Sequence, residues 1–307
     1  MRRAIALLIT LLFIMAITVA IGIGLKQVKD ASKSVENESF IFETSMILDD
    51  VLGILKNTKE LDLIVKNSSQ DVSIDALSIF LAQTSFIPFE SSDMKIILEL
   101  SSARSKFNPN ALVDLNSSSI SLNKVDALKR YLNDNRVNSE YVNIMLDVMG
   151  GVREDMSYNT DIFNEKPYLF RDYISSFKHL DAINDTYLKS YRENSLKDIE
   201  FENLFYFSQD RNISIDVNYA TNEVWEMMLG CDKVRAEQLH DNGGFYTKVD
   251  DLLLTPDEKI ALAMFNISYF EPFLDVKVEI IKGKNNAKIR FEYDMKEKKG
   301  SNFIYEL

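Results

Sequence analysis

The sequence is poor in the residues on which most catalytic and metal sites depend. It contains one cysteine, Cys231, so no disulfide bond can form within the chain. It contains two histidines, His179 and His240, and neither has a cysteine or a second histidine at the spacing of a zinc site. The few glycines form no phosphate-binding loop. We therefore expect a protein that is not an enzyme.

Basic residues are scarce relative to acidic ones. The chain has 35 Lys and Arg against 47 Asp and Glu, which gives a net charge of −12. Binding to nucleic acid requires clustered basic side chains that neutralise phosphates. Residues 224–253 resemble a helix-hairpin-helix, which offers backbone N–H groups to phosphates, but their surroundings are acidic. The sequence therefore predicts no nucleic-acid partner.

Long apolar runs are confined to the N-terminus, where residues 4–25 carry no charge. About 20 apolar residues in a helix cross a hydrocarbon core of roughly 30 Å. We expect a single membrane span over residues 5–25. A secretory signal with a poor cleavage site is the alternative, although such signals have shorter apolar cores. Arg2 and Arg3 should stay in the cytoplasm, which predicts an inner-membrane protein whose C-terminal domain is periplasmic.

Proline is absent between Lys26 and Ile87, which permits a long helix beyond the membrane. Apolar residues recur there at helical spacing, at Phe40, Ile41, Ile47, Leu48, Val51, Leu52, Ile54 and Leu55. The spacing predicts one helix over residues 5–66, with its first half in lipid and its second half packed on a globular domain. A membrane anchor, a polar linker and an unrelated helix are the alternative. A further apolar stretch, residues 72–89, should end as a helix at Pro88.

Alternating apolar and polar residues predict strands near both ends of the globular part. Residues 94–100 show this period of two, as do residues 274–280 and 289–293. The last two segments are separated by residues 283–286, which predicts an antiparallel hairpin. Residues 303–305 are expected to add an edge strand.

The middle of the chain has helical periodicity instead. Residues 121–194 predict a helical subdomain, in which Pro167 is expected to open a third helix. Residues 212–218 predict a short strand. Short helices follow, one capped by Asp232 and another opened by Thr255-Pro256-Asp257-Glu258, a capping-box sequence. These patterns together predict an α+β fold.

Five segments carry a resemblance that covers nearly the whole chain. They are Arg3–Leu8, Lys106–Leu112, Ile215–Val224, Gly244–Leu252 and Ile267–Phe270. The first three resemble the leader junction, an asparagine-containing segment and a strand-to-helix junction of one family. The last two resemble that family's Pro-Phe-x-Ser-x-x-Asp-Leu piece and its entry into the last strands. That family is the type II secretion system protein K family, the large minor pseudopilins.

The resemblance implies a pilin-like long N-terminal helix packed on a small antiparallel sheet, with a large inserted α-helical domain. The implied divisions are a leader peptide (1–4), the long helix (5–66), the pseudopilin α+β core (67–120 and 262–307), the inserted helical domain (121–211) and a small helical module of the helix-hairpin-helix or SAM-like kind (212–261).

The resemblance also implies processing and partners. Prepilin peptidase would cleave between Ala4 and Ile5, and Ile5 would be N-methylated, although Ala4 stands where the family has glycine. Ile5, Ile9, Leu12 and Phe13 would contact partner helices. Most pilin-like subunits have glutamate where this chain has Ile9, and in the family that glutamate neutralises the N-terminal ammonium of a neighbouring subunit. A subunit at the fibre tip has no neighbour above it whose ammonium needs a counter-charge. The implied partners are the I-type and J-type minor pseudopilins and the major pseudopilin.

Calcium is the cofactor that the resemblance suggests. Asp147, Glu154, Asp155 and Asp161 are oxygen donors of the kind that Ca²⁺ takes. Their spacing matches no calcium loop, and a solvated acidic surface is the alternative interpretation.

The sequence thus predicts a minor pseudopilin at the tip of the type II secretion pseudopilus. It would initiate and cap the assembly for protein export across the outer membrane. Two alternatives remain open, a membrane-anchored periplasmic binding or adaptor protein and a minor pilin of a type IV pilus.

Overall fold

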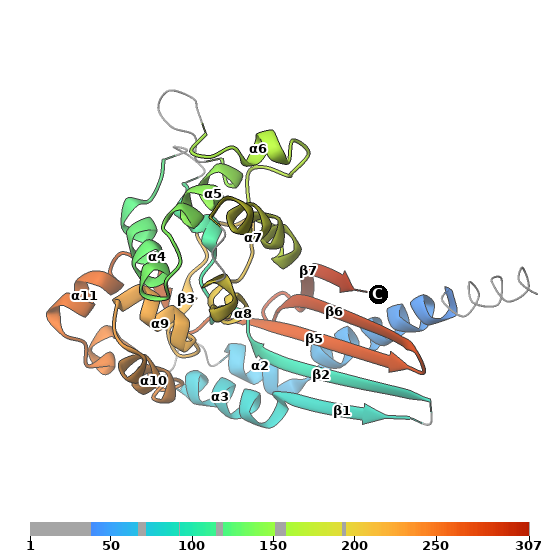
Figure 1. Ribbon diagram of the computed structural model, residues 1–307. Coiled ribbons are helices and arrows are strands. Elements are labelled where there is room, and N and C mark those ends of the chain that lie inside the picture. Colours follow the sequence, from blue (N-terminus) through green and yellow to red (C-terminus); the bar gives the residue numbers. More distant parts are fainter. Residues whose placement is uncertain are drawn as a thin grey trace, which may run out of the picture.

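The computed structural model describes residues 38–66, 72–91, 93–114, 119–150, 158–191 and 195–306. The chain enters through a helix, described over residues 38–57, and continues in α2 (Lys59–Lys66) and α3 (Val72–Thr84). These three helices lie against one face of a sheet (Figure 1). The predicted membrane span lies outside the described residues, among which no helix is long and apolar enough to cross a bilayer.

The predicted single helix over residues 5–66 is interrupted at Thr58 in the described part. Asn57 donates from its amide to the carbonyl of Gly53, and the Thr58 hydroxyl donates to the carbonyl of Ile54, both at 2.8 Å. These side chains supply hydrogen bonds to carbonyl groups of the last turn, and the helix ends there. The N-terminal arm, by which we mean residues 5–66, therefore comprises two helices in its described part, the helix over residues 38–57 and α2.

The main sheet has five antiparallel strands in the order β1-β2-β5-β6-β7. Their bounds are β1 Phe86–Glu90, β2 Met94–Ser102, β5 Phe273–Lys282, β6 Asn285–Asp294 and β7 Lys299–Glu306. The predicted strands, hairpin and edge strand are all present. The second apolar stretch is not one helix up to Pro88, because α3 ends at Thr84 and Pro88 lies within the edge strand β1.

The two faces of this sheet differ in chemistry because side chains alternate along each strand. The face toward the N-terminal helices is apolar and fully buried, and on β5 and β6 it comprises Leu274, Val276, Val278, Ile280, Ala287, Ile289, Phe291 and Tyr293. The opposite face of the same strands carries charges, including Asp275, Arg290 and Glu292. This charged face is turned toward the rest of the protein.

The helical body, residues 107–268, is inserted between β2 and β5 and lies to the left of the sheet in Figure 1. Its elements are η1 Pro109–Leu112, α4 Leu122–Asp134, α5 Glu140–Val148, α6 Ile162–Glu165, α7 Phe177–Tyr191, η2 Ser195–Asp198, α8 Phe201–Leu204, β3 Ile215–Asp216, α9 Asn222–Leu229, α10 Lys233–Asp241, η3 Val249–Leu252, α11 Pro256–Leu262 and β4 Ile267–Ser268. One hydrophobic core from Phe107 to Phe265 joins them, with Trp225 completely buried. The predicted helical domain and small module therefore share a core.

Local signals placed several helix ends correctly. Asp232 accepts a hydrogen bond from the backbone N–H of Arg235, as expected of the cap of α10. Thr255 and Glu258 form the predicted capping box at the start of α11. Gly230 ends α9 in the left-handed conformation, where a Cβ would meet the guanidinium of Arg130. These motifs act within one turn, so tertiary contacts leave them unchanged.

One prediction for the middle of the chain is wrong, and another is correct only in part. Pro167 opens no long helix, since α7 begins at Phe177 and the segment before it is irregular. That segment is fixed by distant groups, because the N–H of Ile174 donates to the Asn110 side chain at 2.7 Å. The strand predicted over residues 212–218 spans only β3, which pairs in parallel with β4 in a separate small sheet.

Candidate functional site

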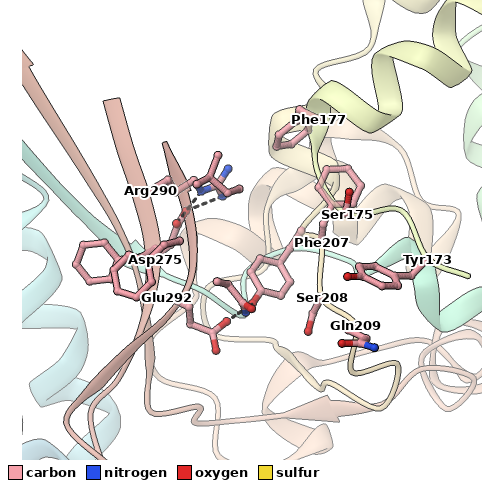
Figure 2. A pocket seen from close by; sticks show the side chains of 14 residues that line it. Tyr173, Ser175, Phe177, Phe207, Ser208, Gln209, Asp275, Arg290 and Glu292 are labelled. Carbon is pink, nitrogen blue, oxygen red and sulfur yellow. Dashed lines mark hydrogen bonds and ion pairs between the residues drawn. The ribbon is translucent and has the colours of Figure 1, made fainter. Parts of the chain in front are cut away.

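A cavity of about 200 Å³ lies between the charged face of the main sheet and the helical body. Figure 2 shows Arg290, Asp275 and Glu292 on the side of the strands, with Phe207 and Phe177 on the side of the helical body. The wall is completed by Tyr173, Ser175, Tyr206, Ser208, Gln209, Phe291, Asn302, Phe303 and Ile304. The site thus combines strand charges with aromatic side chains of the helical body, which lie far away in sequence.

Glu292, which lines the cavity, forms a buried ion pair with Arg104. The Arg104 guanidinium donates to both Glu292 carboxylate oxygens, at 2.5 Å and 3.0 Å. The Tyr206 hydroxyl donates a short hydrogen bond to the same carboxylate, and Arg104 stacks on the ring of Phe273 at 4.2 Å. Burial lowers the pKa of Arg104, but the hydrogen bonds and charge of Glu292 outweigh it, so the pKa is raised. This clamp joins β6 to the helical body.

A second ion pair, between Arg290 and Asp275, lies on the charged face of the sheet. Arg290 donates to the two Asp275 oxygens at 2.8 Å and 2.7 Å. Nearby, Lys106 is half-buried, and burial together with the charge of Arg290 lowers its pKa to about 8. The charged residues that line the cavity, Asp275, Arg290 and Glu292, are each paired, so the cavity is suited to hold an uncharged group.

Two asparagines of the Lys106–Leu112 segment have structural roles that the sequence did not reveal. The Asn108 amide donates to the carbonyls of Ser208 and Asp210, at 3.1 Å and 2.8 Å. The Asn110 amide donates to the carbonyls of Ile174 and Ser208, at 2.9 Å and 3.0 Å. Both side chains fix the loops that form the cavity wall. Their signal in the sequence is the Asn-Pro-Asn pattern, a turn-forming motif.

Arg211 holds three further loops together from a buried position. It donates to the carbonyl of Val113 at 2.9 Å, to that of Met149 at 3.3 Å, and closely to that of Asp172. Asp172 has a positive φ of 91°, a conformation that is costly for a residue with a Cβ. The Arg211 contact stabilises this turn, which precedes Tyr173 in the cavity wall.

Asp216 and Asn218 form a polar node where the helical body meets the sheet. Asp216 is fully buried and accepts hydrogen bonds from the N–H groups of Asn218 and Glu271, at 3.0 Å and 2.9 Å. Burial raises the pKa of Asp216 to about 7, against the opposing effect of these two hydrogen bonds, while the charge of Glu271 adds to the rise. Burial thus favours the neutral form of the Asp216 carboxyl.

We expect Asp216 to make the protein less stable as the pH rises from about 4 to 7. The folded-state pKa lies above that of the unfolded chain, so its stabilising contribution is complete at low pH and is lost as the pH rises through the folded pKa. In Asp216→Asn the side chain cannot ionise. Urea unfolding from pH 4 to 8 should show the original chain losing roughly 2–4 kcal/mol more than the variant. Parallel profiles would contradict the assignment.

The residues predicted from the sequence to form sites lie mostly outside the described chain. These are Ala4, Ile5, Ile9, Leu12, Phe13, Glu154 and Asp155. Asp147 is described and completely buried, and its two oxygens accept four hydrogen bonds of 2.6–2.7 Å from Asn159 and Thr160. The carboxylate of Asp161 accepts from the Asn164 amide at 2.9 Å.

These contacts give Asp147 a structural role that its sequence context did not show. It ties the end of α5 to the loop before α6, and a calcium ion there would have to displace its donors. Among the described residues, no group of three or more His, Cys, Asp or Glu side chains is arranged to hold a metal ion. Calcium binding stays a prediction.

The three side chains considered for catalysis are each engaged in the fold. His179 is buried, and burial lowers its pKa. His240 forms a 2.9 Å hydrogen bond to the carbonyl of Ala220. Burial raises the pKa of Cys231 to about 11, so its thiol is not activated as a nucleophile.

No protein-family model matches the sequence, and no curated protein matches it. Among solved structures, the chain is similar to a chain in the crystal structure of the GspK–GspI–GspJ complex from the type 2 secretion system of enterotoxigenic Escherichia coli. The sequence identity is 15%, the TM-score is 0.46, and the match covers 81% of this chain and 96% of that chain. This chain itself combines helices with a five-stranded antiparallel sheet, as the sequence predicts.

Proposed function

We propose that this protein is a minor pseudopilin that joins a pseudopilus through its N-terminal arm. The observation that carries the proposal is that the helix over residues 38–57 buries one apolar face and also exposes large apolar side chains among the polar residues of its outer side. One face, with Phe40, Leu48, Val51 and Leu55, is buried on the sheet. The outward side carries Ile41, Phe42, Met46 and Ile54, which are 46–67% exposed. A helix that faces only water on its outer side carries polar residues there.

The outward apolar side is suited to a neighbouring helix of another subunit. Four large apolar side chains on one helix form the kind of exposed surface that marks a protein contact. In sequence the helix follows the apolar run of residues 5–25, which lipid would cover before assembly. Support for the proposal therefore comes from both segments of the arm.

Within the fibre, we place the protein at the tip, where it starts and caps the assembly. The helical body, residues 107–268, adds bulk beside the sheet that subunits stacked above would have to accommodate. Ile9 in place of glutamate agrees with a position that has no neighbour above. The expected partners are the I-type and J-type minor pseudopilins and the major pseudopilin, in the inner membrane and periplasm. The assembly would serve protein export across the outer membrane.

Site-specific cross-linking tests this proposal. A photoreactive amino acid at Phe42 or Met46 should cross-link to the N-terminal helices of other pilin-like subunits in cells. The same group at Leu122, which is equally exposed but lies on the helical body, should give at most a small fraction of these products. Cross-links from Leu122 alone would instead support a membrane-anchored adaptor.

Processing of the N-terminus gives a separate expectation. Mass spectrometry of the membrane-extracted protein should find a chain that begins at Ile5 and carries one added methyl group. Deletion of prepilin peptidase should leave Met1 in place. An intact Met1 in cells with active peptidase would contradict cleavage between Ala4 and Ile5.

A further inference from the structure

The two edges of the main sheet differ in their ability to accept another strand. Among the described residues, no strand pairs with the outer side of β1 or of β7. The outer strand β1 contains Pro88, which lacks an N–H and blocks continued pairing. β7 contains no proline, and its residues Phe303, Ile304 and Tyr305 are all exposed. An exposed apolar edge of this kind is a template for pairing.

A bulge connects this free edge to the cavity. The register of β6 and β7 shifts between Arg290 and Glu292, and Asn302 adopts a positive φ of 55°. The Asn302 amide donates to the Tyr206 hydroxyl at 3.4 Å, and Tyr206 in turn contacts Glu292. Bulges commonly redirect a side chain beside a binding site. Here the bulge turns part of β7 into a wall of the cavity.

The cavity beside β7 selects for an uncharged side chain. Asn302, Phe303 and Ile304 line it from the strand, and Phe177 and Phe207 line it from the helical body. Its charged groups are paired, Arg290 with Asp275 and Glu292 with Arg104. A charged guest would lose its hydration without gaining a free partner, whereas an aromatic guest would contact aromatic walls.

We propose that the outer edge of β7 binds an extended segment of another polypeptide as a sixth strand, with a large uncharged side chain of that segment in the cavity. Backbone pairing would supply affinity and the cavity would supply selectivity. Charge complementarity sets the direction, because β7 begins at Lys299 and has Glu306 near its end. An antiparallel segment with a basic first residue and an acidic last residue matches both charges. The inference does not depend on the proposed pseudopilin function.

A synthetic peptide tests the proposal on the full chain in detergent micelles. The probe is a fluorescent peptide of alternating threonine and tyrosine between an N-terminal lysine and a C-terminal glutamate. We expect saturable binding by fluorescence anisotropy, and slower amide hydrogen exchange in residues 299–306. Methylation of alternate backbone nitrogens should weaken binding at least tenfold, as should aspartate in place of tyrosine. Equal binding of either altered peptide would overturn the proposal.

Matched variants distinguish peptide binding in the cavity from binding elsewhere on the surface. Gln209→Trp fills the cavity from an exposed position and should weaken binding of the tyrosine peptide at least tenfold. Gln238→Trp, the same change at an exposed position on α10, should leave binding unchanged. Equal affinities of these two variants would overturn the role of the cavity. A concentration-dependent dimer that Tyr305→Lys abolishes would overturn the proposal in favour of a second copy of this chain on β7.

Discussion

Replacing Glu292 with glutamine is expected to lower the free energy of unfolding by about 3–5 kcal/mol, the usual cost of removing one partner from a buried ion pair. The variant keeps the shape of the side chain but leaves the buried Arg104 guanidinium without a counter-charge. It also weakens the hydrogen bond from Tyr206. Urea unfolding of the full chain, followed by the fluorescence of its single tryptophan, the buried Trp225, measures the loss.

Glu99→Gln is the matched control for this prediction. Glu99 lies on β2 of the same sheet and faces Lys277 at 3.9 Å, but both side chains are exposed. Exposed ion pairs contribute about 0–1 kcal/mol, so this variant should unfold almost as the original chain does. Similar losses in the two variants would show that the Arg104–Glu292 clamp is not the source of the stability.

Replacing Asn218 with alanine is expected to cost roughly 3–5 kcal/mol, because buried polar groups left without partners are destabilising by about 1–3 kcal/mol each and relaxation recovers part of the loss. The Asn218 side chain makes four hydrogen bonds. Its oxygen accepts from the N–H groups of Gly244 and Tyr246, and its amide donates to the carbonyls of Tyr246 and Tyr269, all at 2.7–2.9 Å. The loop before η3 should loosen first, which amide hydrogen exchange of residues 243–247 can detect.

Asn242→Ala is a close comparison because it removes another asparagine from the same region. Its amide makes one exposed hydrogen bond, to the carbonyl of Gln238. Surface changes of this kind usually stay within about 0.5 kcal/mol. If Asn242→Ala is as destabilising as Asn218→Ala, the effect belongs to the loop in general and not to the buried amide.

The parts of the fold that the sequence predicted are those determined by nearby residues. The β5–β6 hairpin follows from alternation around a two-residue turn at Gly283, which has a positive φ of 60°. The start of α11 follows from Thr255 and Glu258, three residues apart. Such signals operate over one turn or one strand pair, so they are readable without knowledge of the tertiary structure.

The candidate site was not predictable in this way. Alternation correctly placed Asp275, Arg290 and Glu292 on one face of the hairpin, and such a face is usually solvated. Here the helical body covers it, and Glu292 is paired with Arg104, which lies 188 positions earlier in the chain. Likewise, the apolar residues after Pro167 resembled a helix, but hydrogen bonds with Asn110 and Arg211 hold that segment in an irregular path. Contacts at such separations leave no periodic pattern.

The two connections of the helical body have a mechanical consequence. The chain leaves the sheet after Ser102 and returns at Phe273, and the N–H of Ala103 donates to the carbonyl of Phe273 at 3.0 Å. The segments that enter and leave the helical body are thus hydrogen-bonded to each other where they join the sheet. A force along the N-terminal arm would be transmitted to the strands through the apolar layer between them. The backbone of the helical body forms a closed loop that does not connect the arm to the strands. Even a strong pull on the arm should therefore leave that body folded.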